Sequence, residues 1–441
     1  MTSCRFHSTP ALRFARSEVT LAAPAALSLA LCGRADAQTP APPPPPQDPT
    51  VTNRVEAAEA YGDVPKRELV SFNQFEGRWF SVRVGGGVLF DYSTYSQDED
   101  SETQMAISPL GDLRDFRLLA KGKVLHPNIT YTIGYMYDKA ADAWRFRQTG
   151  IMVAVPRLHG SVFVGRTKEG FSTNKMMVGY QGWANERTTM NDALIPILAD
   201  GIKVTGSTPG GTIVYNFGFF KDTRSEAESF NKNDKQTAAR VVWLPKIGGT
   251  EKTVLHFAVE ARHARSDDGT LRYRSKPESF QAQAYAIDTG SFTADYANAV
   301  GVEAYYRPGP LVFGMEYFVN QTKAPEVGDP LFHGGEIFAA YTLTGEVKPY
   351  NAGGAYFERL SPARPVLSGG PGAWELVTRF SYSDLDDDGI RGGRFWRFTP
   401  VVNWYLTDNL RLEFVYGYSS LNRFGVVGKT QYFQTRFQFQ L

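Results

Sequence analysis

The chain ends with Thr430-Gln-Tyr-Phe-Gln-Thr-Arg-Phe-Gln-Phe-Gln-Leu441. One set of alternate positions in this stretch carries three phenylalanines and Leu441, whereas the other carries three glutamines and Arg436. Successive side chains of a β-strand point to opposite faces, so strict alternation predicts a strand with one apolar and one polar face. Such a strand fits the edge of a soluble sheet, or a transmembrane barrel whose strands meet lipid on one face and the lumen on the other. In a barrel, Arg436 would face water in the channel.

The composition favours an all-β chain. Lys and Arg total 47 against 46 Asp and Glu, a net charge of +1, which excludes the basic footprint of a nucleic-acid-binding domain. Aromatic residues make up 13% of the chain, with 22 Tyr and 30 Phe. Beyond the N-terminus there is no run of about 18 or more apolar residues, the length that a transmembrane helix requires.

The N-terminus has the pattern of a secretory signal. Three arginines precede the apolar stretch Leu21–Cys32, and Ala35-Asp36-Ala37 forms an A-x-A cleavage site before Gln38. We therefore expect a signal peptide over residues 1–37 and export of the chain; a disordered basic arm is the alternative. Both cysteines, Cys4 and Cys32, lie within this segment, so the mature chain would contain no disulfide, thiol nucleophile or Cys-ligated metal.

The rest of the chain divides into two parts. We expect residues 38–78 to form a Pro-rich linker with a short N-terminal segment and residues 79–441 to form an outer-membrane barrel domain. From Trp79 onward apolar and polar residues alternate in sixteen stretches, most clearly in Ile129–Tyr137. About 23 residues per strand is the spacing of a porin-sized barrel. The sequence thus predicts an all-β fold, a sixteen-stranded antiparallel transmembrane β-barrel.

The connection lengths support this topology. In outer-membrane barrels short turns on one side alternate with longer loops on the other. Short connections follow the even-numbered predicted strands, and long polar ones such as Asp384–Gly393 follow odd-numbered strands. The 34-residue insert Thr167–Asp200 is long enough to suggest a functional loop. Residues 345–373 are the exception, because this long connection follows strand twelve; we interpret it as a periplasmic or lumen-entering loop.

Three sets of motifs resemble the phosphate-selective porin O and P family. They are Val164-Gly-Arg-Thr-Lys-Glu-Gly-Phe-Ser172, Asn185-Glu-Arg-Thr-Thr-Met-Asn-Asp-Ala193, and a C-terminal group that includes Asn403-Trp-Tyr-Leu406. Gly170 stands where the family often has proline. The resemblance covers about Trp79–Leu441. It implies an outer-membrane barrel, commonly a homotrimer, with its third loop folded into the lumen and a constriction lined by basic residues that passes anions or phosphate.

Ten basic residues are the candidate pore-lining and anion-binding set. Clustered Arg and Lys in a narrow pore attract anions and repel cations, and Arg can bind phosphate oxygens through two parallel hydrogen bonds. The alternative is that lumen charges only solvate the interior and pair with acids such as Asp115, Glu260, Glu316 and Glu375. Six lie on the polar face of the first four predicted strands and four on or beside the inward loop: Arg83, Arg117, Lys121, Lys123, Arg145, Arg147, Lys168, Lys175, Arg187 and Lys203.

We expect a porin of the Gram-negative outer membrane that passes small anions passively, with phosphate as the narrower expectation. Its partners would be outer-membrane lipid and small anions, without a catalytic residue, cofactor or metal. Alternatives are a non-selective porin, a structural or adhesive outer-membrane protein, and a barrel hydrolase that uses His256. Asp384-Leu-Asp-Asp-Asp-Gly389 matches the start of a calcium loop but lacks the closing Glu, and is interpreted as a solvated extracellular turn.

Overall fold

The computed structural model describes residues 73–138, 143–221, 235–246 and 253–441. The predicted signal peptide, residues 1–37, and most of the predicted linker lie outside these described residues. The end of the linker region contains a short strand, β1 (Gln74–Glu76), which pairs with the first barrel strand. Ordered sheet therefore begins a few residues before Trp79.

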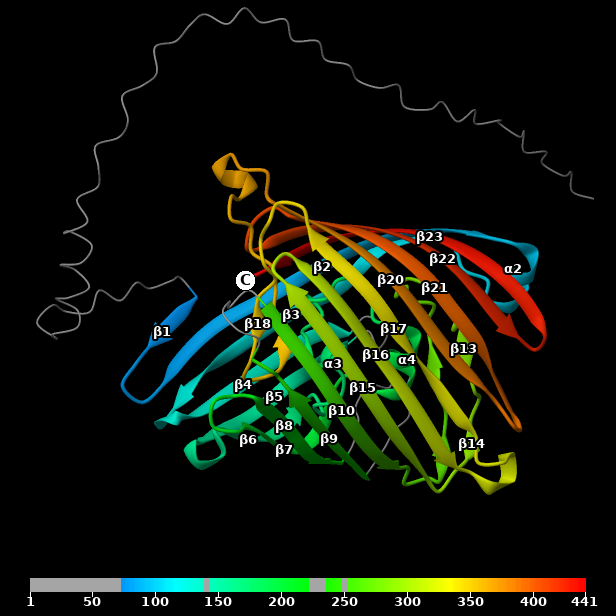
Figure 1. The fold of residues 1–441 in the computed structure, drawn as a ribbon, viewed down its shortest axis with the longest axis horizontal. Helices are drawn as coiled ribbons and strands as arrows, with labels where there is room; N and C mark the ends of the chain where they lie inside the picture. Colours follow the sequence, from blue (N-terminus) through cyan, green and yellow to red (C-terminus); the bar gives the residue numbers. More distant parts are fainter. Residues whose placement is uncertain (1–72, 139–142, 222–234, 247–252) are drawn as a thin grey trace, which may run out of the picture. The chain divides into compact units, whose positions relative to one another are not determined.

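Sixteen strands of the described chain form one closed antiparallel barrel (Figure 1). Each strand pairs with the next, and the first pairs with the last in the register Val88↔Phe439, which closes the sheet. The predicted fold class is confirmed. The barrel strands are β2 (Ser81–Gln97), β3 (Leu110–Val124), β4 (His126–Asp138), β5 (Ala143–Val155), β6 (Gly160–Thr167), β7 (Ala199–Ser207), β8 (Ile213–Phe220), β9 (Lys235–Trp243), β10 (Thr253–Arg265), β15 (Tyr296–Pro308), β16 (Leu311–Lys323), β17 (Leu331–Thr342), β20 (Ala373–Asp387), β21 (Ile390–Tyr405), β22 (Leu410–Arg423) and β23 (Val426–Gln440).

The two faces of the strands differ as the alternation predicts. On β23 the side chains of Phe433 and Phe437 are 47% and 42% exposed on the outer face, whereas Tyr432 and Gln434 are buried on the inner face. An apolar outer surface costs little in lipid and much in water. No helix among the described residues is long and apolar enough to cross a membrane.

The remaining elements of the described chain are short and lie in the connections. The helices are α2 (Glu99–Gln104), α3 (Thr173–Met176) and α4 (Thr189–Leu194), and the single 3-10 turns are η2 (Pro156–Leu158), η3 (Pro325–Val327) and η4 (Val366–Ser368). The small strand pairs are β11 (Thr270–Leu271) with β14 (Phe292–Thr293), β12 (Arg274–Ser275) with β13 (Ile287–Asp288), and β18 (Tyr350–Asn351) with β19 (Tyr356–Phe357).

Three connections contribute side chains to the interior. The inward loop (residues 168–198) joins β6 to β7, the second inward loop (266–295) joins β10 to β15, and the turn-side insert (343–372) joins β17 to β20. The inward loop is the third connection on the long-loop side of the barrel, as predicted. Leu194 of this loop packs in one buried cluster with Ile287 of the second inward loop, and Trp183 packs in another with Phe357 of the turn-side insert.

One predicted connection is wrong. Residues Asp384–Gly393 were expected to form a long polar loop, but strands β20 and β21 continue through most of it and pair as far as Asp387↔Ile390. The turn itself is only Asp388 and Gly389. Asp384 accepts an ion-pair contact from Arg394 Nε at 2.9 Å, so the charged residues neutralise each other across the hairpin and do not interrupt it.

A charged residue in the outer face of β23 tests the lipid-facing assignment. Phe433→Arg at the middle of this strand is expected to lower the free energy of unfolding in lipid vesicles by about 2–4 kcal/mol, the cost of arginine near the bilayer midplane. Urea titration in vesicles, followed by the gel mobility of unboiled protein, measures it. Phe433→Leu is the control, and equal stability of the two variants would contradict the assignment.

Candidate functional site: a constricted, basic lumen

The inward loop begins with a turn that sits on acidic side chains of the barrel wall. The Ser172 backbone N–H donates to Glu260 at 2.8 Å, and its hydroxyl donates to Glu316 at 2.6 Å. The Thr173 hydroxyl donates to Glu303 at 2.8 Å. Ser172 has a left-handed backbone, φ +66°, which costs energy for a residue with a side chain. The two hydrogen bonds to wall carboxylates hold it there.

Gly170 explains a departure from the family pattern. Its φ of +90° is open to glycine, whereas the ring of proline fixes φ near −65°. The chain therefore enters the inward loop by a backbone path that proline cannot follow.

The wall acids beneath the loop are also neutralised from the barrel side. Arg240 on β9 contacts Glu260 at 3.1 Å and Glu303 at 2.7 Å, and all three side chains are fully buried. His256 on β10 contacts Glu303 at 2.9 Å and the Tyr350 hydroxyl at 2.7 Å. His256 therefore belongs to a buried network that ties the wall to the turn-side insert.

A second attachment holds the middle of the inward loop through Glu186. Its carboxylate receives hydrogen bonds from Arg114 Nε at 2.9 Å and from Arg436 at 2.6 Å. Arg436 also binds Asp91 on β2, at 2.6 and 2.7 Å. Although burial opposes ionisation, the charges of Arg114 and Arg436 hold the pKa of Glu186 at about 2. Arg436 lies on the inner face of the barrel as expected, but its side chain is only 3% exposed because it clamps the loop.

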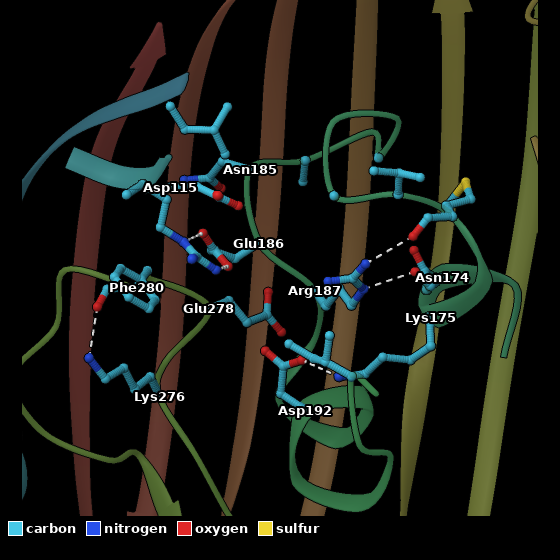
Figure 2. A pocket seen from close by; sticks show the side chains of 18 of the residues that line it. Asp115, Asn174, Lys175, Asn185, Glu186, Arg187, Asp192, Lys276, Glu278 and Phe280 are labelled. Carbon is cyan, nitrogen blue, oxygen red and sulfur yellow. Dashed lines mark hydrogen bonds and ion pairs between the residues drawn. The ribbon is translucent and has the colours of Figure 1, made fainter. Parts of the chain in front are cut away.

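Between the loop and the first strands lies a cavity of about 250 Å³ (Figure 2). Nine basic and five acidic residues line it, an excess of four positive charges before any titration. The acids have basic partners: Asp115 pairs with Arg117, Asp192 with Lys175, and Glu278 with Arg379. An excess of positive charge in a confined space of this kind attracts anions.

Five of the ten predicted basic residues line this cavity: Arg117, Arg147, Lys168, Lys175 and Arg187. Arg187 Nε donates to the Asn174 carbonyl at 2.8 Å, which Figure 2 shows across the loop. Lys168 Nζ donates to the Met176 carbonyl at 2.8 Å. Burial, and then the nearby positive charges of Arg187 and Arg117, lower the pKa of Lys168 well below its usual range. The loop therefore carries cations that are crowded together.

The other five predicted residues lie outside the cavity lining. Lys203 on β7 is adjacent, since its Nζ donates to the Lys168 carbonyl at 3.0 Å. Arg83 and Lys121 are paired in register on β2 and β3 and are exposed near the short-turn end of these strands, as is Lys123. Arg145 lies two residues from Arg147 on the inner face of β5, toward the long-loop side. The structure thus spreads the ten residues over the height of the barrel.

Four further basic residues line the cavity but were not among the ten predicted from the sequence: Arg114, Lys276, Arg379 and Arg436. Arg379 and Arg436 occupy inner-face positions, so alternation alone was sufficient to find them. Arg114 alternates with the outer face of β3, and a bulge between Leu89 and Phe90 shifts the register beside it. Lys276 lies on the second inward loop, where strand alternation carries no information.

The turn-side insert closes part of the lumen from the opposite end. Lys348 is 1% exposed and lies 3.4 Å from Glu375, with its Nζ 4.9 Å from the Trp183 ring centroid of the inward loop. Arg240 donates to the Ala355 carbonyl at 3.0 Å. The long connection after the twelfth strand therefore enters the lumen, which is one of the two interpretations that its length suggested.

A closed sixteen-stranded barrel with an apolar outer face and a loop folded into a charged lumen is the architecture of an outer-membrane porin. Residues 82–441 match the family model of the phosphate-selective porin O and P family, and the chain belongs to this family.

The chain is similar to two curated proteins over part of its length. It is 28% identical to Porin O of Pseudomonas aeruginosa over 193 residues, 37% of this chain and 43% of that protein. It is 30% identical to an uncharacterized protein of Caulobacter vibrioides over 181 residues, 40% of this chain and 36% of that protein. The chain thus spans less than half the length of these relatives.

The solved structures share the fold at low sequence identity. A loop L8 deletion mutant of OmpT of Vibrio cholerae matches with a TM-score of 0.51 at 11% identity, over 82% of this chain and 99% of that chain. The outer membrane channel DcaP of Acinetobacter baumannii matches with a TM-score of 0.51 at 10% identity, over 83% and 99%.

Removing the Glu186 charge is expected to loosen the inward loop. Glu186→Gln leaves Arg114 without its carboxylate partner and Arg436 with only one, and breaking a buried ion pair costs about 3–5 kcal/mol. Single-channel recording should then show more frequent closures. Glu99→Gln, an exposed residue of α2, is the matched control. A closure frequency equal to that of wild type would show that Glu186 does not hold the loop.

The clamp also predicts a pH dependence. The folded pKa of Glu186, about 2, is below the usual value for glutamate, about 4.3, so the clamp stabilises the loop fully above about pH 4.3. Its contribution decreases as pH falls from about 4.3 toward 2. The closure frequencies of wild type and Glu186→Gln should therefore become equal as the pH falls through this window. Convergence already at pH 6 would contradict the assignment.

Proposed function

We propose that the chain forms a water-filled outer-membrane channel that passes small anions by passive diffusion. The observation that carries the proposal is the segregation of charge in the lumen. Glu260, Glu303 and Glu316 on the strands from β10 to β16 lie buried beneath the inward loop and bind its backbone and hydroxyl groups. The basic side chains of β3, β5 and the loop line the open cavity.

This segregation favours anions for an electrostatic reason. A carboxylate that already accepts hydrogen bonds from the loop and an ion pair from Arg240 presents little field to a passing ion. Arg117, by contrast, lines the same cavity as Arg147 and Arg187. Cations crowded in a confined lumen lower the energy of an entering anion and raise that of a cation.

The ten predicted residues would then act at successive positions along the pore axis. Arg145 lies on the long-loop side, where ions enter from outside. Arg117, Arg147 and Arg187 form the narrow part. The proposed roles of the rest follow from position: Lys168, Lys175 and Lys203 shape the inward loop or support it from the wall, and Arg83, Lys121 and Lys123 line the exit toward the short turns.

Phosphate is the narrower proposal within this class. Guanidinium groups bind phosphate oxygens through paired hydrogen bonds, and Arg117, Arg147 and Arg187 are grouped in one cavity. The family to which the chain belongs supports phosphate as a solute. Inorganic phosphate added to one side should reduce the chloride current through single channels at millimolar concentration. A current unaffected by phosphate would restrict the proposal to anions in general.

The remaining parts of the proposal concern location and assembly. Residues 1–37 would direct export and be removed, outer-membrane lipid would surround the apolar face, and three copies would form a homotrimer, as the family resemblance implies. The channel would need no cofactor and catalyse no reaction. The mass of unboiled detergent-solubilised protein tests the assembly, with about three times the monomer mass expected.

The double variant Arg117→Gln/Arg147→Gln tests the proposed selectivity region. A unit charge about 8 Å from an ion in water contributes about 0.5 kcal/mol, so the loss of two charges raises the energy of an anion by about 1 kcal/mol and lowers that of a cation by about the same amount. The anion-to-cation permeability ratio should therefore decrease by about thirtyfold. The reversal potential in a salt gradient measures this ratio.

Arg157→Gln/Lys246→Gln is the matched control, because it removes the same charge from two exposed residues of the short turns. Salt screens charges beyond about 10 Å, so this control should leave the ratio close to that of wild type. If both double variants lower the ratio equally, net charge rather than the cavity sets selectivity.

A further inference from the structure

We infer that the constriction selects organic anions with an aromatic or apolar body over equally charged small hydrophilic anions. The inference rests on the proposed anion channel and names its solute class more closely. The observation is that the cavity with the basic cluster also has an apolar lining. Apolar and aromatic residues that line it include Met136, Val178, Ile197, Phe280 and Tyr285.

Val178 shows most clearly that this apolar lining is available to a solute. It lies on the inward loop directly after Met177, which is 1% exposed, yet the Val178 side chain is 39% exposed. It lines the same cavity as Arg117 and Arg187. The loop thus buries the Met177 side chain and leaves the neighbouring Val178 side chain exposed to the lumen. Apolar surface left exposed in a concave site beside a few charged groups is typical of ligand-binding pockets.

Aromatic rings already lie against the cations of this cavity. Arg114 Cζ lies 3.6 Å from the ring centroid of Phe280, and Lys276 Nζ lies 4.9 Å from the same centroid. Arg114 binds Glu186 at the same time, through Nε at 2.9 Å. A guanidinium can therefore stack on a ring and bind a carboxylate together here, which are the two contacts that an aromatic carboxylate or phosphonate requires.

The size of the cavity is compatible with such a solute. A dry cavity of about 150 Å³ accommodates benzene in another protein, and this one measures about 250 Å³. A phenyl ring could lie against Val178 and Phe280 while its head group reaches the basic cluster. Inorganic phosphate, or a methyl-substituted analogue, gains the charge contacts but covers almost none of the apolar lining.

The test compares two anions with the same head group, methylphosphonate and phenylphosphonate, as blockers of the chloride current through the purified channel. We expect phenylphosphonate to reach half-block at about a tenfold lower concentration, which corresponds to about 1.4 kcal/mol. Burial of roughly 55 Å² of ring surface suffices at about 25 cal/mol per Å². Equal half-blocking concentrations would overturn the inference.

A pair of variants assigns the effect to the cavity. Val178→Thr should reduce the phenyl-to-methyl ratio by about threefold, because a hydroxyl replaces one apolar methyl group in the lining. Val300→Thr makes the same substitution on the outer face of β15, where the side chain is 51% exposed, and should keep the wild-type ratio. An unchanged ratio in Val178→Thr would overturn the assignment to this cavity.

The wild-type reversal potential in a salt gradient separates the two proposals. An anion-selective channel with equal block by both phosphonates would leave the proposed function intact and contradict only the organic-anion inference. A cation-selective channel would contradict the proposed function and, with it, this inference.

Discussion

The lumen depends on the contact between the first turn of the inward loop and the acidic wall. Buried carboxylates are costly unless charges and hydrogen bonds compensate them. Ser172, Thr173 and Arg240 provide that compensation for Glu260, Glu303 and Glu316. The same contacts fix the loop across the lumen. One set of interactions therefore both narrows the pore and covers the carboxylates that would oppose anion entry.

The second clamp completes this arrangement from the other side of the barrel. Arg436 of the last strand binds Asp91 of the first strand and Glu186 of the loop. The seam that closes the barrel is thereby tied to the loop that narrows it. Because the loop is held near its start by hydrogen bonds to buried carboxylates and in its middle by ion pairs, the basic cavity has defined walls, and selectivity can depend on the side chains that line it.

Much of the barrel was predictable from the sequence, and much of the cavity was not. Lipid contacts one face of each strand, so residues such as Phe217 and Phe219 repeat with period two and reveal the strand locally. The role of Arg436 was not predictable in this way, because its partner Glu186 lies 250 residues away. The lumen position of Arg114 was not predicted, because a bulge displaces the register of the strand pair beside it. Asp384–Gly393 was wrongly predicted to be a loop, because the charged residues that pair across the hairpin resemble a polar connection.

The central claim is that the wall acids lie buried beneath the inward loop while basic residues outnumber acidic ones in the cavity lining, so the lumen favours anions. The most direct measurement is the reversal potential of purified wild-type protein in a planar bilayer that separates two potassium chloride concentrations. Potassium and chloride diffuse at similar rates, so the sign reports the channel. The account predicts a potential displaced toward that of chloride, and a potential displaced toward that of potassium would contradict it.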